Sequence, residues 1–420
     1  MQKNSSIKLG VIADDFTGAS DAASFLSKSG ADTLMFTSIP QNLDHDCEAI
    51  VIALKSRSAS LEKAVSMTKE AVDFLNHIGC EKIYFKYCST FDSTPKGNIG
   101  VVLDFLMEYL KQPYTLLCPS LPENGRTVKD GILYVDGVKL SDSPMKNHPL
   151  NPMWDSYIPN LMKDQSHYPC FVLTKEDMES NPLEEKIKDI SLKHQKFYLI
   201  PDYENDEDGR LIAKLFKHLP LLSGGSALLE HIAGAKGSKR AVFDGQNLKG
   251  RRSIILCGSC SRATKRQIEY YRSAGGILYG VDSKELLSGK LNVNDVFEYV
   301  KNQSRTTLVY STAIDGDMAS LKRSPTFDME SNLIESMMAD LSSLAIADGF
   351  KNIVVAGGET SGAVTLNLGF DGFLIGESIA PGVPVLTPLK NDDIRLILKS
   401  GNFGCDDFFL KAIGEHDVMV

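Results

Sequence analysis

The chain is poor in the features that mark membrane, secreted and nucleic-acid-binding proteins. No apolar run in its 420 residues is long enough to span a bilayer, and residues 1–6 lack the apolar core of a secretory signal. The formal net charge is −9, and the chain has no concentrated basic face that would suit a nucleic acid. We therefore expect a cytoplasmic protein whose partners include neither a membrane nor a nucleic acid.

Cysteine motifs for disulfide bonds or zinc are also sparse. The 8 cysteines are mostly scattered, several of them in apolar runs typical of buried reduced thiols. Cys257 and Cys260 match the C-x-x-C pattern, which suits a redox pair or half of a zinc site. Because no second such pair and no H-x-x-x-H lies at zinc spacing, we expect no metal site here and regard the two cysteines as incidental.

Length and composition favour two globular domains. A chain of 420 residues exceeds one ordinary hydrophobic core, and 43% hydrophobic with 24% charged residues is ordinary for a globular protein. Strand-like and helix-like segments alternate in the first half, with strands expected at residues 7–13, 49–54, 82–87 and 114–118 and helices at 21–29, 61–78 and 99–110. This alternation predicts an α/β fold of two domains, each a mostly parallel sheet flanked by helices.

Two stretches interrupt the alternation. Residues 119–151 are rich in Gly, Pro, Asn and Asp, which predicts a hairpin-bearing insertion, lid or binding loop. Residues 235–252 are small and basic, which suits a linker or hinge, and a fresh strand follows them. We therefore place the first domain at residues 1–234, the linker at 235–252 and the second domain at 253–420.

The most informative motif is an acidic loop after the first strand. Residues 9–13 are apolar and end in Asp14 and Asp15, and a Thr-Gly turn and a helical pattern follow. Ligands of open α/β sheets bind beyond the carboxyl ends of the strands. Two neighbouring carboxylates there can bind a metal or act as a base, because one can stay ionised while the pKa of the other is raised. The alternative is that one of them only caps the helix, Asp15 in particular.

Polar side chains also follow two later strands. Arg57, at the carboxyl end of one strand, could clamp a carboxylate bidentately, with a surface salt bridge as the alternative. Lys86, Ser89 and Asp92 lie around the end of the next strand and could contact sugar hydroxyls or phosphate. Turn formation is the alternative for Ser89. These side chains make a second set of candidate binding residues.

Three loops in the second half are dominated by Gly, Ser and Thr, and each follows an expected strand, at residues 253–257, 352–356 and 393–398. Glycine lets the backbone approach an anion closely, and helix N-termini offer free N–H groups, so three such loops on one sheet edge predict a nucleotide-phosphate site. The candidate residues are Ser259 in the first loop, Gly357, Gly358, Glu359, Thr360, Ser361 and Gly362 in the second, and Gly401, Asn402, Phe403 and Gly404 in the third. Neither a P-loop nor a G-x-G-x-x-G motif is present, which disfavours a dinucleotide oxidoreductase.

These motifs resemble those of the four-carbon acid sugar kinase family over nearly the whole chain. The resemblance rests on residues 12–19, 55–58, 86–94, 357–362 and 399–404. Members are two-domain, ATP-dependent kinases whose N-terminal domain binds a small sugar acid and whose C-terminal domain binds the nucleotide. Residues 91–100, 118–119, 124–127 and 147–153 are most similar to the branch of the family that acts on 3-oxo-tetronates.

The resemblance implies transfer of a phosphoryl group from ATP to the C4 hydroxyl of a 3-oxo-tetronate. D-threonate, L-threonate or D-erythronate is the alternative substrate. Asp14 or Asp15 would be the base. Arg57 and Lys86 would hold the substrate carboxylate. The glycine loops would bind ATP, with Mg²⁺ on its phosphates.

Other readings of the same residues are less favoured. An aspartyl-phosphate phosphatase would need a second Asp where the chain has Phe16. A non-enzymatic sugar-acid sensor is a remote alternative, because a pure binder has no need of three glycine loops in a second domain. Association of the chain into a homo-oligomer is left open.

Overall fold

The computed structural model describes residues 7–43, 45–147, 151–180, 182–233, 248–312 and 327–415. The chain divides into two compact units, Met1–Ser238 and Lys239–Val420. Residues 235–247 of the expected linker lie outside the described residues. The proposed domain bounds of 1–234 and 253–420 therefore stay predictions.

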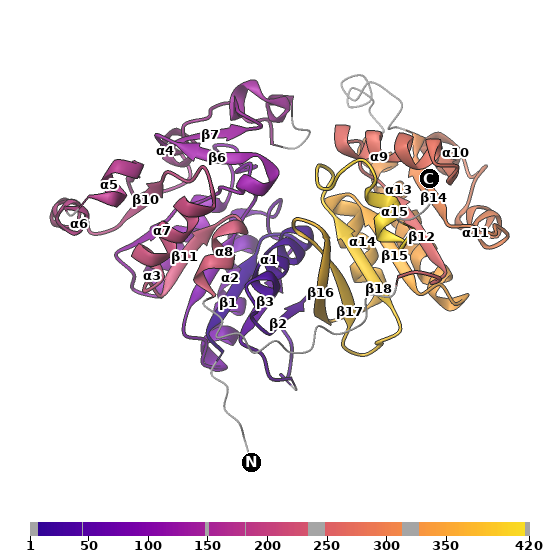
Figure 1. The fold of residues 1–420 in the computed structure, drawn as a ribbon, viewed down its shortest axis with the longest axis horizontal. Coiled ribbons are helices and arrows are strands. Elements are labelled where there is room, and N and C mark those ends of the chain that lie inside the picture. Colours follow the sequence, from indigo (N-terminus) through magenta and orange to yellow (C-terminus); the bar gives the residue numbers. More distant parts are fainter. Residues whose placement is uncertain are drawn as a thin grey trace, which may run out of the picture. The chain divides into compact units, whose positions relative to one another are not determined.

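The first unit is built on a five-stranded parallel sheet with the strand order β11-β4-β1-β3-β2 (Figure 1). Its strands are β1 (Leu9–Ala13), β2 (Thr33–Phe36), β3 (Ala49–Ala53), β4 (Ile83–Lys86) and β11 (Leu221–Gly224). Its helices are α1 (Phe16–Lys28), α2 (Leu61–His77), α3 (Ile99–Tyr109), α7 (Asp206–Phe216) and α8 (Ala227–Ile232). Every residue of these strands is buried, as expected for a parallel sheet covered on both faces.

Two smaller sheets complete this unit. A parallel sheet has the order β5-β10-β9, from β5 (Tyr114–Leu116), β10 (Phe197–Pro201) and β9 (Cys170–Leu173), and it is accompanied by α4 (Ile158–Lys163), α5 (Lys175–Glu179) and α6 (Leu183–Lys193). An antiparallel sheet is formed by β6 (Arg126–Lys129), β7 (Ile132–Val135) and β8 (Val138–Lys139). The hairpin expected within residues 119–151 is therefore confirmed.

The second unit has the strand order β16-β17-β18-β15-β12-β14-β13, with β16 and β17 antiparallel to their neighbours and the other strands parallel. Its strands are β12 (Ser253–Cys257), β13 (Ile277–Val281), β14 (Thr307–Ser311), β15 (Asn352–Ala356), β16 (Gly372–Ala380), β17 (Val383–Pro388) and β18 (Arg395–Lys399). Its helices are α9 (Arg262–Ser273), α10 (Ser283–Leu287), α11 (Val293–Lys301), α13 (Phe327–Ala347), α14 (Gly358–Leu368) and α15 (Phe408–Ala412). The predicted fold class, α/β with a mostly parallel sheet in each unit, is confirmed.

One local expectation was wrong, and one strand was missed. The first helix begins at Phe16 and not near residue 21, because the side chain of Asp15 caps it directly after the strand. The strand β2 was not expected, because its four residues give too short an apolar run to show a period. None of the 8 cysteines takes part in a disulfide bond. Among the helices that the structure describes, none has the length and apolar character needed to cross a membrane.

The candidate sites of the two units lie at equivalent positions in their sheets, at the end of the first strand of each unit. In the first unit β1 lies between β3 and β4, and in the second β12 lies between β14 and β15 (Figure 1). At such a point the chain reverses its direction of winding, and the loops on either side diverge to leave room for a ligand. The acidic loop follows β1, and the first glycine loop follows β12.

Candidate active site

The carboxylate of Asp14 is held by the guanidinium of Arg57. Arg57 Nε donates to Asp14 Oδ2 at 2.9 Å and Nη2 donates to Asp14 Oδ1 at 2.7 Å. The backbone joins the same two loops, because the amide of Arg57 donates to the carbonyl of Asp14 at 3.1 Å. Asp14 is 2% exposed. This bidentate pair fixes the residue after β1 against the loop after β3.

Asp15 has a different position. Its Oδ1 accepts from the amide of Gly18 at 2.8 Å, and its Oδ2 accepts from Thr17 Oγ1 at 2.9 Å, so Asp15 caps α1. Arg57 Nη2 also donates to Asp15 Oδ1 at 2.8 Å. The capping role considered for Asp15 is therefore real, and its side chain is 22% exposed while that of Asp14 is 3% exposed. Only Asp15 of the two presents its carboxylate toward solvent.

Burial controls the protonation of this pair. It raises the pKa of Asp14, and the charge and hydrogen bonds of Arg57 oppose that rise. Burial also acts to lower the pKa of Arg57, but the charges of Asp14 and Asp15 outweigh it and raise that pKa well above its ordinary value. Arg57 is therefore a permanent cation, and loss of a carboxylate partner would leave its charge poorly compensated.

A second buried ion pair lies beside the first. Lys86 Nζ is 3.3 Å from Asp21 Oδ2, which also accepts from Ser226 Oγ at 2.7 Å. The pair joins the end of β4, the helix α1 and the start of α8. Burial raises the pKa of Asp21, and Lys86 opposes that rise. A Cβ added to Gly18 would lie 3.3 Å from Lys86 Nζ and also against the carboxylate of Asp15, so the two pairs belong to one site.

The loop after β4 completes the site in the first unit. Asp92 Oδ2 lies 3.7 Å from Arg57 Nη1, and Ser89 is buried nearby in sequence. Phe91 and Asp92 have φ angles of 61° and 42°, a left-handed conformation that costs energy for residues other than glycine. Strain of this kind concentrates at functional sites, and here it holds Asp92 toward the cluster. Of the predicted residues, the structure thus gathers Asp14, Asp15, Arg57 and Asp92 in one ion-pair cluster.

In the second unit the three glycine loops lie side by side, because β18, β15 and β12 are adjacent and parallel. The amide of Ser259 donates to the carbonyl of Ala356 at 3.1 Å. The amide of Gly357 donates to the carbonyl of Lys399 at 2.9 Å. A Cβ on Gly401 would lie 2.5 Å from Ser259 Oγ, so a larger residue there would force the Ser259 side chain to move.

The second glycine loop is shorter than expected. Residues 357–362 were expected to form a loop, but α14 already begins at Gly358. Only Gly357, with a φ of 128°, has a conformation that other residues rarely adopt. Gly358 and Glu359 are exposed, whereas Thr360, Ser361 and Gly362 are buried in the first turns of the helix. The amides of that first turn have no acceptor within the helix, and they give this end a partial positive charge.

The third glycine loop is held by side chains of α9. Thr264 Oγ1 donates to the carbonyl of Gly401 at 2.9 Å, and Gln267 Nε2 donates to the carbonyls of Phe403 and Gly404 at 2.9 Å each. Asn402 is exposed. The loop is therefore fixed by its carbonyl groups.

Lys399 is a buried cation behind this loop. It is 0% exposed, and its Nζ donates to Thr264 Oγ1 at 3.0 Å and to the carbonyls of Gly401 and Ser400 at 2.9 and 3.1 Å. Among the described residues, no carboxylate forms an ion pair with it. Burial lowers the pKa of Lys399 to about 8. Its ammonium group thus organises the loop, and it loses its proton at a lower pH than an exposed lysine does.

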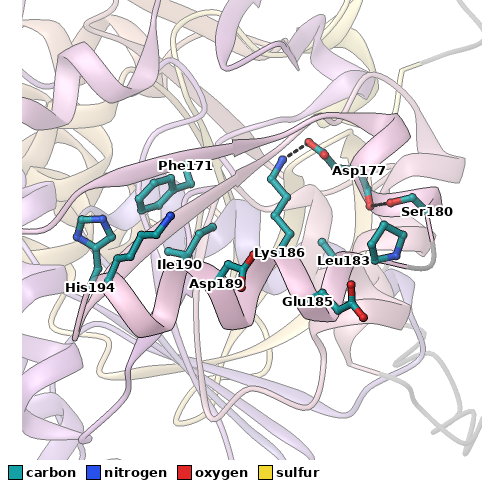
Figure 2. A pocket seen from close by; sticks show the side chains of 11 residues that line it. Phe171, Asp177, Ser180, Leu183, Glu185, Lys186, Asp189, Ile190 and His194 are labelled. Carbon is teal, nitrogen blue, oxygen red and sulfur yellow. Dashed lines mark hydrogen bonds and ion pairs between the residues drawn. The ribbon is translucent and has the colours of Figure 1, made fainter.

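A surface pocket lies apart from all these residues, against α6 and β9 (Figure 2). Its polar groups bind one another, since Lys186 Nζ lies 2.6 Å from Asp177 Oδ2 and Ser180 Oγ donates to the carbonyl of Asp177 at 2.8 Å. No predicted site residue lines it. In the part of the chain that the structure describes, no group of three or more His, Cys, Asp and Glu side chains is arranged to hold a metal ion.

Sequence reasoning missed three residues of these sites: Asp21, Ser226 and Lys399. Asp21 was placed in a helix, with no sign that it faces a lysine from another strand. Ser226 was not among the candidate residues. Lys399 could have been identified from its position at the end of an otherwise apolar strand, because a lysine buried there needs polar partners.

Two domain families match the chain, one in each unit. The sugar-binding N-terminal domain family matches residues 9–232. The nucleotide-binding C-terminal domain family matches residues 254–409.

Relatives match over almost their whole length. A 3-oxo-tetronate kinase of Brucella melitensis is 38% identical over 97% of this chain and 95% of the relative. One from Salmonella typhimurium is 37% identical over 98% of this chain and all of the relative, and one from Escherichia coli is 38% identical over 89% of this chain and 99% of the relative.

Solved structures share the fold. A crystal structure from Salmonella typhimurium LT2, described as a candidate tRNA synthase, is 36% identical with a TM-score of 0.83, covering 97% of this chain and 98% of that one. A Haemophilus influenzae protein is 37% identical with a TM-score of 0.73, covering 96% of this chain and 99% of that one.

The cap at Asp15 predicts a difference between two substitutions. Asp15→Ala removes the acceptor for the first-turn amide and should lower the free energy of unfolding by about 1–2 kcal/mol. Asp15→Asn keeps an equivalent acceptor, and Arg57 keeps its buried partner Asp14, so this variant should cost less than Asp15→Ala, about 0.5 kcal/mol. Urea unfolding of both variants measures the difference. Equal losses would show that the cap contributes nothing.

Lys399 predicts a pH-dependent stability difference. Its pKa of about 8 lies below the value of 10.5 expected in the unfolded chain, so between these pH values only the unfolded chain binds the proton. The free energy of unfolding of the native protein should therefore rise with pH in this window relative to Lys399→Met, by at most about 1.4 kcal/mol per pH unit. Denaturant titrations of both proteins from pH 7 to 10.5 test this. A pH-independent difference would contradict it.

Proposed function

The chain belongs to the family of kinases that join a sugar-binding N-terminal domain to a nucleotide-binding C-terminal domain, and we propose that it phosphorylates the C4 hydroxyl of a 3-oxo-tetronate with ATP. The choice of substrate rests on one observation. Relatives named 3-oxo-tetronate kinase match this chain from end to end at 36–39% identity, through both units.

In the proposed reaction the nucleotide is bound by the second unit. The N-terminus of α14 and the glycine loops around Ser259 and Gly401 would face its phosphates, because their amides and close backbone approaches suit an anion. Mg²⁺ would enter as part of the nucleotide substrate, with ligands from phosphate oxygens and water.

The sugar acid would be bound by the first unit. The C4 hydroxyl oxygen attacks the γ-phosphorus, a new O–P bond forms, the bond to the β,γ-bridging oxygen breaks, and ADP leaves. The hydroxyl proton passes to a carboxylate. We assign this acceptor to Asp15, because its side chain is 22% exposed and that of Asp14 only 3%.

Arg57 then has a positioning role in addition to any contact with substrate. The guanidinium of Arg57 binds Asp14 in a bidentate manner, and its Nη2 also donates to Asp15. Arg57 therefore sets the orientation of Asp15, the proposed proton acceptor. Ser89 and Asp92 would contact sugar oxygens, and Lys86 would contact the phosphoryl group being transferred. Positioning and charge neutralisation supply most of the catalysis in phosphoryl transfer.

A role on tRNA is not proposed for this chain, although one structural neighbour carries that description. The net charge of −9 opposes binding to a polyanion. A cytoplasmic location and the oligomeric state remain predictions.

A substrate panel tests the proposed reaction. The purified protein is assayed for Mg²⁺-ATP-dependent ADP release with both 3-oxo-tetronates, both threonates and both erythronates. We expect turnover on a 3-oxo-tetronate. Turnover only on a threonate or erythronate would support the mechanism but contradict the proposed substrate. The 3-oxo-tetronates have a carbonyl at C3 where threonates and erythronates have a hydroxyl, and a binding site can distinguish the two groups. No turnover by folded protein would overturn the proposal.

Substitution of each aspartate tests the assignment of the proton acceptor. Asp15→Asn should keep the cap, and hence the stability, while lowering kcat by roughly 100-fold or more. Asp14→Asn should lower kcat and also lower the free energy of unfolding by roughly 3 kcal/mol, because Arg57 loses its main counter-charge. Steady-state kinetics beside urea unfolding separate the two effects. Near-native turnover by Asp15→Asn would refute its role.

A further inference from the structure

Arg126 is a buried cation that the mechanism above does not use. It begins β6 and is 9% exposed. Its Nη1 donates to the carbonyl of Asn124, and its Nε has no hydrogen-bond partner. Among the described residues, no carboxylate lies within ion-pair distance of its guanidinium. A buried charge without a counter-ion is costly, and such a group is typical of a ligand site.

The backbone brings Arg126 to the edge where the candidate site lies. Leu121 and Arg126 are paired, with the amide of each donating to the carbonyl of the other at 2.8 and 3.1 Å. Just before them, the carbonyl of Cys118 accepts from the amide of Gly225 at 2.9 Å. The preceding residue, Gly224, lies in register with Lys86 across β11 and β4.

Charged groups of the candidate site in the first unit act on Arg126. Burial lowers its pKa, and the charges of Asp136, Cys88 and Asp21 partly offset this effect. Asp21 is the partner of Lys86, and Cys88 follows β4 by two positions. Arg126 is therefore within electrostatic reach of the candidate site without being paired to any of its carboxylates.

The other buried cations of the site already have carboxylate partners. Arg57 is bound to Asp14 and Asp15, and Lys86 is paired with Asp21. A second donor beside Arg126 also has no acceptor, since Asn124 Nδ2 is buried without a partner. A carboxylate has two acceptor oxygens and a negative charge, which would satisfy donors of this kind.

We propose that Arg126 binds the carboxylate of the sugar acid and so makes the enzyme selective for acids over neutral sugars. This inference rests on the proposed function for the identity of the substrate. It assigns Arg57 to orienting the aspartates and Arg126 to recognition of the carboxylate.

Kinetics of substituted proteins test the proposal. Arg126→Met, Arg126→Lys and the native protein are compared on the acid that the native protein phosphorylates best and on a neutral four-carbon ketose with the same terminal hydroxyl. Arg126→Met should lose roughly 100-fold in kcat/KM on the acid, mainly through KM, with KM for ATP unchanged. On the ketose it should stay within about 3-fold of the native protein, and Arg126→Lys should recover part of the loss on the acid.

Lys129→Met is the matched control. Lys129 lies on the same strand, is exposed and pairs with Glu204 at 3.5 Å, so its loss should leave both substrates unaffected. An equal loss on acid and ketose by Arg126→Met would indicate a structural role and overturn the proposal. A loss on the acid of less than about 3-fold would overturn it as well, while the kinase function itself would stand.

The melting temperature separates the two possible roles of Arg126. Loss of an arginine that stabilises the fold would lower the melting temperature, whereas loss of a ligand-binding arginine would not. Without ligand, Arg126→Met should melt at the same or a higher temperature than the native protein, because it removes an uncompensated buried charge. A lower melting temperature together with loss of activity on both substrates would assign Arg126 to the fold.

A binding measurement distinguishes failure of the proposed kinase function from failure of the proposed role of Arg126. If the native protein phosphorylates none of the acids, calorimetric titration with threonate and erythronate compares the native protein with Arg126→Met. Binding by the native protein alone would support a carboxylate site at Arg126. Equal binding by the two proteins, or binding by neither, would overturn it.

Discussion

The buried ion pair between Asp14 and Arg57 is the interaction on which the sugar-binding unit depends. It joins the residue after β1 to the loop after β3, and it reaches the start of α1 through Asp15. Because Arg57 is always charged and little exposed, its carboxylate partners cannot be removed without cost. The arrangement of the strand end, the loop and the helix start is thus maintained by charge, before any substrate binds.

The nucleotide-binding unit uses the same topology with a different chemistry. Its loops also lie where the winding of the sheet reverses, but they are held by backbone carbonyls, hydroxyls and the buried ammonium of Lys399. Few acidic side chains take part in these contacts. This suits a polyanionic ligand, since amide donors attract phosphate while carboxylates would repel it.

Both units keep buried polar groups unsatisfied near their sites. In the first unit these are the Nε of Arg126, Oδ1 of Asp21 and the hydroxyl of Ser120, and in the second the hydroxyl of Ser361. The left-handed backbone of Phe91 and Asp92 adds strain at the same edge. Natural sequences keep such costs mainly at ligand sites, so these groups support the proposed placement of the two sites.

The amino-acid sequence alone determined the alternation of strands and helices, the hairpin insertion and the position of the acidic and glycine-rich loops. These features are local: apolar period, turn residues and strand ends can be recognised within a few positions. Asp14, Arg57 and Asp92 were each identified as polar residues at or after the end of an expected strand, and such loops meet at one edge of a parallel sheet.

Only the tertiary structure decided which charged groups pair. Asp21 and Ser226 are 205 positions apart, and Arg57 is 43 positions from Asp14. No local pattern encodes such contacts, because they depend on strand order and on the few ångströms that separate one side chain from the next. The same limit hid the isolation of Arg126, since whether a counter-ion is present is settled by neighbours in space.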